Sequence, residues 1–121
     1  MTIQEAIRQC DEMQPNAYSM EEKVRWLTRL DGRIWREILS THEGADGEAP
    51  AYTVEDMDAM LLVPSPYEEM YLLYLQSQID YNNAEYGRYN NSTALFNEAY
   101  QAYANDINRT RRPVGCTTIR V

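Results

Sequence analysis

Residues that could perform catalysis or bind a metal are few in this sequence of 121 residues. His42 is the single histidine, and the two cysteines, Cys10 and Cys116, lie near opposite ends of the chain. One histidine gives no convincing Ser/His/Asp or Cys/His arrangement for nucleophilic catalysis. The cysteines lack the C-x-x-C spacing of metal sites, and no glycine-rich phosphate loop is present. We therefore predict a protein that is not an enzyme and has no catalytic, cofactor-binding or metal-binding residues.

Acidic side chains gather in the segment 43–58, which contains no basic residue. The segment lacks the alternating ligand pattern of a calcium loop, so it predicts no metal site. Its glycines and proline interrupt helical periodicity, which predicts a long loop. A plain solvated loop and a loop that faces a partner or lines a channel both remain open. The acidic residues are Glu43, Asp46, Glu48, Glu55, Asp56 and Asp58.

Charge is unevenly distributed along the chain. The formal net charge is −8, yet residues 109–121 contain four arginines and no acidic residue. An acidic body argues against nonspecific binding of duplex DNA, which requires clustered Lys and Arg. The basic end predicts docking onto an acidic partner, with a frayed terminus as the alternative. The partner-binding residues expected there are Arg109, Arg111, Arg112, Pro113, Thr117, Ile119, Arg120 and Val121.

Apolar residues at intervals of three and four predict helices over about 2–13, 19–41, 66–82 and 84–109. Thr2-x-x-Glu5 and Ser19-x-x-Glu22 have the spacing of capping boxes, and Ser65-Pro66-Tyr67-Glu68 has the signals of a helix start. We expect 66–109 to be nearly continuous, with a break or kink near 82–87. No apolar run is long enough for a membrane span, and no secretory signal is recognisable at the N-terminus.

These elements predict an all-α fold, a small helical bundle of about four helices with a long acidic loop (43–58) and an extended C-terminal tail. Two domains are expected: a helical domain over 1–109 and a basic extended tail over 110–121. Eight of the ten tyrosines lie between residues 67 and 103. They either fill the core with their hydroxyls at its margin or contact other chains.

Four arginines spaced along one side of the second helix either pair with nearby acidic residues in solvent or form a contact with another subunit. They are Arg25, Arg29, Arg33 and Arg36. The residues expected at a subunit interface are Arg29, Arg33, Tyr86, Tyr89, Asn90 and Asn91.

The run from Leu62 to Tyr71 (LVPSPYEEMY), together with IDYN at 79–82 and GRYNNS at 87–92, resembles small helical proteins of tailed phages and prophages of Gram-positive bacteria. Those proteins are similar in size and layout to head–tail connector (adaptor) proteins. The resemblance covers about residues 60–108 in amino-acid sequence and most of the chain in the order of its expected elements.

The resemblance implies a structural virion protein that forms a homo-oligomeric ring, typically of about twelve copies, beneath the portal. Such a ring extends the DNA channel, lets genomic DNA pass without specific binding, and receives the tail or a tail-completion protein. The C-terminal tail is the segment that would dock onto the portal protein. The implied location is the virion neck, after synthesis in the bacterial cytoplasm, with no membrane contact.

A second hypothesis is a small acidic inhibitor that mimics DNA and occupies a host nuclease or restriction system. The net charge favours it, whereas the arginine series and the basic tail do not. A nucleic-acid-binding module that uses the basic tail is a third, limited by only four arginines. The ring copy number, the tail type, the face that meets the portal and the state before assembly are not determined by the sequence.

Overall fold

The protein is described by a computed structural model that places residues 1–45 and 47–113. These residues form an all-α bundle, which confirms the predicted fold class, and their only β pairing consists of isolated bridges. No helix in the described ranges is long and apolar enough to cross a membrane. The elements in chain order are α1 (Ile3–Met13), α2 (Met20–Ile34), a π-helical turn η1 (Trp35–Leu39), α3 (Glu69–Asn82) and α4 (Tyr86–Thr110).

The first two helices begin as their capping signals predict. Thr2 and Glu5 form a complete capping box, in which each side chain accepts from the other residue's backbone N–H. The Ser19 hydroxyl accepts from the Glu22 N–H, but the Glu22 carboxylate turns to Arg25, 2.6 Å away, so this box is half formed.

The third helix begins at Glu69, three residues later than the sequence predicts. Residues 65–68 form turns, and the Glu68 carboxylate binds the N-terminal ammonium of Met1 at 3.3 Å. The expected capping glutamate is therefore used for a long-range ion pair between the chain start and α3.

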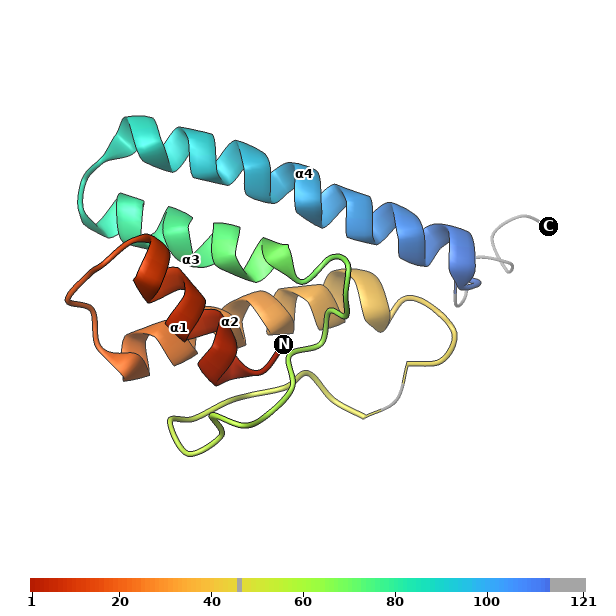
Figure 1. Cartoon of the computed structure of the whole chain (residues 1–121). Coiled ribbons are helices and arrows are strands. Elements are labelled where there is room, and N and C mark those ends of the chain that lie inside the picture. The colour runs from red at the N-terminus through yellow and green to blue at the C-terminus, as the bar shows by residue number, and fades with distance from the viewer. Residues whose placement is uncertain (46, 114–121) are drawn as a thin grey trace.

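The break expected near 82–87 is present, but the expected near-continuity of the segment 66–109 was wrong. Asn83–Glu85 separate α3 from α4, and the two helices run antiparallel as a hairpin (Figure 1). Ala84 has a φ of 59°, and the left-handed conformation that this represents ends a helix and turns the chain. Backbone bonds from Ala84 N–H to Tyr81 and from Glu85 N–H to Asp80 close the turn.

The second helix ends in a wider turn than its regular periodicity predicts. In η1 the Ser40 N–H donates to the carbonyl of Trp35 at 2.8 Å, five residues earlier. Such a turn contains one residue more than an α-helical turn, which rotates the side chains that follow it. Ile38, Leu39 and His42, in and just after this turn, are all buried.

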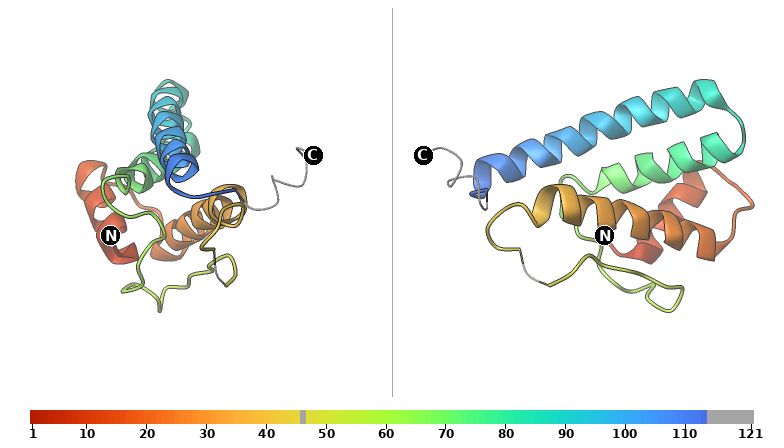
Figure 2. Two further views of the ribbon diagram at one scale, coloured as in Figure 1. Left: turned by 90° about the vertical axis from the view of Figure 1, so that its right-hand side faces the viewer. Right: turned by 180° about the vertical axis from the view of Figure 1, so that it is seen from behind.

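The hydrophobic core lies around α3, which sits between α4 on one side and α1 and α2 on the other (Figures 1 and 2). Apolar residues on nearly every side of α3 suit this central position. The largest fully buried side chains include Trp26 and Tyr71. Tyr74, one turn away on α3, is only half-buried.

Cys10 is buried in this core, and burial raises the pKa of its thiol to about 11. Against the ordinary value of 9.0, this lowers the thiolate fraction at pH 8 by about 100-fold. In a Cys116→Ser variant we expect Cys10 to resist iodoacetamide at pH 8 in native protein and to react fully in urea. Rapid alkylation of the native variant, followed by mass spectrometry, would show that α1 does not cover this thiol.

Candidate partner interface

Aromatic and arginine side chains of three helices form one surface, which we call the arginine–tyrosine face. The Tyr81 ring packs on Tyr86 and Tyr89, with centroids 6.2 and 5.3 Å apart. Nearer the other end of α4, the Phe96 ring contacts Tyr74 and Tyr100. The residues of this face are Arg29, Arg33, Glu37, Tyr74, Tyr81, Tyr86, Tyr89 and Tyr100. Arg36 of η1 lies at its edge, where its charge acts on Glu37.

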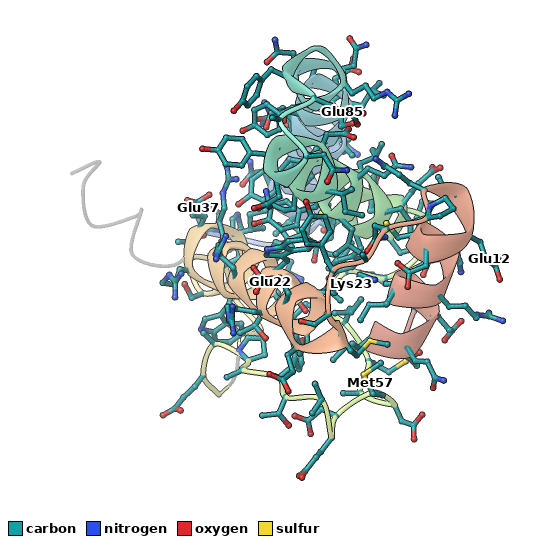
Figure 3. All side chains as sticks on the ribbon, turned by 90° about the vertical axis from the view of Figure 1, so that its left-hand side faces the viewer. Glu12, Glu22, Lys23, Glu37, Met57 and Glu85 are labelled. Carbon is teal, nitrogen blue, oxygen red and sulfur yellow. The ribbon has the colours of Figure 1, made fainter. Side chains whose placement is uncertain are left out.

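The arginines of α2 tie this face to α4. Arg33 lies 4.4 Å from the centroid of the Tyr100 ring and donates to Glu37 at 3.0 Å. The Tyr100 hydroxyl also donates to Glu37, at 2.7 Å. This hydroxyl, followed by Arg33, holds the pKa of Glu37 below its usual value. Figure 3 shows Glu37 on the opposite side of the body from Glu12 of α1.

Burial raises the pKa of the Tyr74 hydroxyl, although neighbouring Arg29 opposes the shift. Arg29 thus lies against the tyrosines as Arg33 does. Arg25 and Arg33 are in ion pairs with Glu22 and Glu37, whereas Arg29 and Arg36 are exposed and form no ion pair within the described ranges.

The structure brings together only part of the expected subunit interface. Tyr86 and Tyr89 lie on the arginine–tyrosine face with Arg29 and Arg33, and Tyr86 is 58% exposed. Asn90 is exposed on α4. Asn91 lies elsewhere, beside a shallow pocket of about 290 Å³.

This shallow pocket lies between α1, α3 and α4. Asp80, which is buried, accepts there from Gln14 at 2.7 Å and from Ser92 at 2.9 Å. These bonds join the three helices, so Asp80 has a structural role that the sequence did not indicate.

The acidic loop, residues 43–58 without Asp46, which lies outside the described residues, is a second candidate surface. Glu43, Glu48, Glu55 and Asp58 are exposed, and no acidic side chain of the loop forms an ion pair within the described part of the chain. Asp56 is half-buried and accepts from the N–H of Thr53 at 2.8 Å, which fixes a turn.

The second half of this loop and the segment that follows it are fixed to the helices. The Tyr52 N–H donates to the Thr28 hydroxyl at 3.1 Å. Further along, Ile3 and Gln4 of α1 donate to the carbonyls of Ala59 and Met57. The acids at 55, 56 and 58 therefore lie on a segment that is hydrogen-bonded to the helices, with Glu55 and Asp58 exposed to solvent.

Asp31 of α2 anchors this segment from inside the core. Its carboxylate is fully buried and accepts from the hydroxyls of Tyr52 and Tyr71, both at 2.6 Å, and from the Leu62 N–H at 3.1 Å. Burial raises the pKa of Asp31, while these three donors lower it in part. Burial likewise raises the pKa of both tyrosines, which keeps their hydroxyls protonated as donors.

Sequence reasoning missed Asp31, although a signal was present. Asp31 lies four residues after Leu27 and three before Ile34, in the register of the buried stripe of α2. A carboxylate in that register has to find donors inside the protein. Its partners lie 21 to 40 residues away in sequence, and no local pattern identifies them.

The basic C-terminal end begins where α4 ends. Arg109 pairs with Asp106 at 3.3 Å, while Arg111 and Arg112 are exposed and form no ion pair within the described ranges. The Glu43 N–H donates to the Arg112 carbonyl at 2.8 Å, beside an isolated bridge between His42 and Pro113. Thr117, Ile119, Arg120 and Val121 lie outside the described residues.

A cavity of about 520 Å³ opens at this end of the bundle. Its walls come from the α2–η1 junction, the segment 62–67 and the last turns of α4. The side chains that line it include Trp35, Leu39, Leu62, Tyr67, Tyr103, Ile107 and Arg111.

His42 holds the end of η1 against α4. Its Nδ1 lies 2.7 Å from the carbonyl oxygen of Ile38, and its Nε2 lies 2.7 Å from Asn108. The Ile38 carbonyl also accepts from the Thr41 hydroxyl at 2.8 Å, so two side chains serve this carbonyl near the helix end. The placed residues include no cluster of three or more His, Cys, Asp or Glu that could hold a metal ion.

Comparison of the chain with protein-family profiles, with curated proteins and with solved structures finds no match. The function proposed below therefore rests on the surfaces of this molecule and on the resemblance of its sequence.

Proposed function

We propose that this protein is a structural subunit of the neck of a tailed bacteriophage, a head–tail connector that assembles with copies of itself beneath the portal. The resemblance of residues 62–92 to small helical proteins encoded among phage head-assembly genes supports this proposal. The all-α bundle is compatible with it, although many functions share such a fold.

The observation that carries the proposal is the separation of three surfaces of different chemistry on one small body. The tyrosines at 81, 86 and 89 lie at the α3–α4 turn, and the arginines at 109, 111 and 112 lie at the other end of α4 (Figure 1). A helix of 25 residues is about 37 Å long. The later part of the acidic loop, residues 47–58, lies on the side of α2 away from α4 (Figures 1 and 2). Its first residue, Glu43, lies instead beside the basic end, where its N–H donates to the Arg112 carbonyl.

A connector needs such separation because it contacts neighbouring subunits, the portal and the tail at the same time. The basic end is suited to an acidic portal surface, since opposite charges orient two proteins as they meet. An acidic surface toward the channel repels the phosphates of genomic DNA, so that DNA slides without binding.

The proposal is tested by an affinity pull-down of tagged protein from cells producing the phage, with partners identified by mass spectrometry. We expect recovery of the portal protein and a tail-completion protein, and loss of the portal on deletion of 111–121. That deletion leaves α4 and the buried Ile107 intact, so it separates docking from folding. Recovery of a host nuclease or restriction complex in place of the portal would support the DNA-mimic hypothesis and overturn ours.

A further inference from the structure

Two surfaces of this molecule have complementary charges that remain unpaired within one copy. On the arginine–tyrosine face, Arg29 and Arg36 are exposed and in no ion pair with the residues described. On the acidic loop, the same holds for Glu43, Glu48 and Glu55. The exposed arginines could therefore form ion pairs with the exposed glutamates of another copy.

The two surfaces lie on different sides of α2 and do not overlap. Thr28 and Asp31 face the loop, to which they are hydrogen-bonded. Arg29 and Arg33 lie on the other side, next to the tyrosines of α3 and α4. One copy can therefore offer its loop to one neighbour and its arginines to another.

Both surfaces are already held in place. The last part of the loop is fixed by Asp31 through Tyr52 and Leu62. On the other surface, Arg33 of α2 lies against the Tyr100 ring, which packs on Phe96. Binding between such surfaces loses little conformational entropy. The tyrosines, with Tyr81 55% and Tyr86 58% exposed, add the rigid aromatic area that is enriched at interfaces.

We infer that the partner of the arginine–tyrosine face is the acidic loop of a second copy of this chain, in a head-to-tail contact. A contact of this kind joins unlike surfaces, so repeated copies close into a ring or extend as a filament. The inference rests on the proposed function for its biological setting, but its chemistry depends only on the two surfaces.

A second copy fits this face better than a nucleic acid does. Glu22 and Glu37 lie among the arginines, paired with Arg25 and Arg33. A continuous line of phosphates would have to pass these carboxylates, and the net charge of −8 opposes it further. Separate carboxylates on a loop can instead approach Arg29 and Arg36 one at a time, with the bidentate geometry that arginine favours.

The test is a charge exchange followed by sedimentation velocity at low salt. One variant carries Arg29→Glu and Arg36→Glu, and the other carries Glu48→Arg and Glu55→Arg. Each alone is expected to be monomeric because its two surfaces then have like charge. An equimolar mixture is expected to regain the oligomers of the unmodified chain, since the exchanged surfaces pair again. Association of the unmodified chain is expected to fall about tenfold or more from 50 to 500 mM NaCl.

Arg8→Glu with Arg88→Glu is the matched control for the Arg29/Arg36 variant, because it makes the same change in net charge away from both surfaces and is expected to keep association. Circular dichroism of each variant verifies the fold. A monomeric unmodified chain, or single variants that associate as the unmodified chain does, would overturn the inference. If one of these results is obtained while the pull-down still recovers the portal protein, this inference is wrong but the proposed function is retained. Binding of a single-stranded oligonucleotide that is lost in the Arg29/Arg36 variant, with self-association unchanged, would assign the face to nucleic acid instead.

Discussion

Replacing Asp31 with alanine is expected to lower the free energy of unfolding by roughly 3–5 kcal/mol. The carboxylate accepts three hydrogen bonds inside the protein, from two hydroxyls and one backbone N–H. Its removal leaves these donors without partners in the core, and each unsatisfied buried donor costs about 1–3 kcal/mol. Urea unfolding followed by tryptophan fluorescence measures the change.

Asp58→Ala is the control for this prediction, since it makes the same chemical change at an exposed position and is expected to change stability by less than about 0.5 kcal/mol. Tyr71→Phe tests the network separately. It removes the bond to Asp31 and leaves the Val63 N–H without its acceptor, so a loss of about 1–3 kcal/mol is expected. Equal stability of Asp31→Ala and Asp58→Ala would contradict the anchoring role of Asp31.

The second large effect is expected for Arg111→Glu combined with Arg112→Glu, which should abolish incorporation into virions while leaving helicity unchanged. Both side chains are exposed just beyond α4 and in no ion pair with any described residue, so the fold does not depend on their charge. Reversal turns attraction to an acidic partner into repulsion. Complementation of a phage that lacks the gene, scored by infectious titre, measures the loss, which we expect to exceed 100-fold.

Arg8→Glu with Arg88→Glu again provides the matched control, since it makes the same charge change on α1 and α4. Arg88 lies in an exposed pair with Glu85, and such pairs contribute little to stability. If the Arg111/Arg112 variant supports the same normal titre as the Arg8/Arg88 control, the C-terminal arginines do not dock the protein onto its partner.

Local signals were sufficient to predict much of the fold. The Thr2–Glu5 capping box set the start of α1, and Pro15 and Asn16 marked its end within two or three residues. Apolar residues on nearly every side of α3 are typical of the central helix that it forms. Local signals failed where a distant group intervened: Glu68 pairs with the N-terminus, and α3 begins after it.

The α3–α4 turn shows a different limit. Asn82, Asn83 and Gly87 predicted a break near the right place, but only the left-handed Ala84 sets the chain reversal. The Cβ of alanine disfavours this left-handed conformation, so the sequence gave no reason to expect it at residue 84.

Part of the candidate interface could be predicted from residue type and spacing, and part could not. The arginine spacing on α2 placed Arg29 and Arg33 on one side, as observed. Tyr89 and Asn91 are two residues apart, so the geometry of α4 itself places them on different sides, and grouping them in one interface was inconsistent with helical spacing. That Asn91 lies beside a pocket lined also by residues of α3 and the end of α1 could not be predicted from spacing. Tyr71 and Tyr74 were equally plausible core residues by sequence, and only the network of Asp31 separates them.

The most direct test of the central claim is quantitative mass spectrometry of purified virions, with the portal protein as the internal standard. In virions, a connector subunit is expected in fixed proportion to the portal protein, at about one copy per portal chain. In tail-less heads, it is expected only when assembly of the neck has been completed. Absence of the protein from purified virions, with the full amount remaining in the cell lysate, would contradict a structural role in the neck.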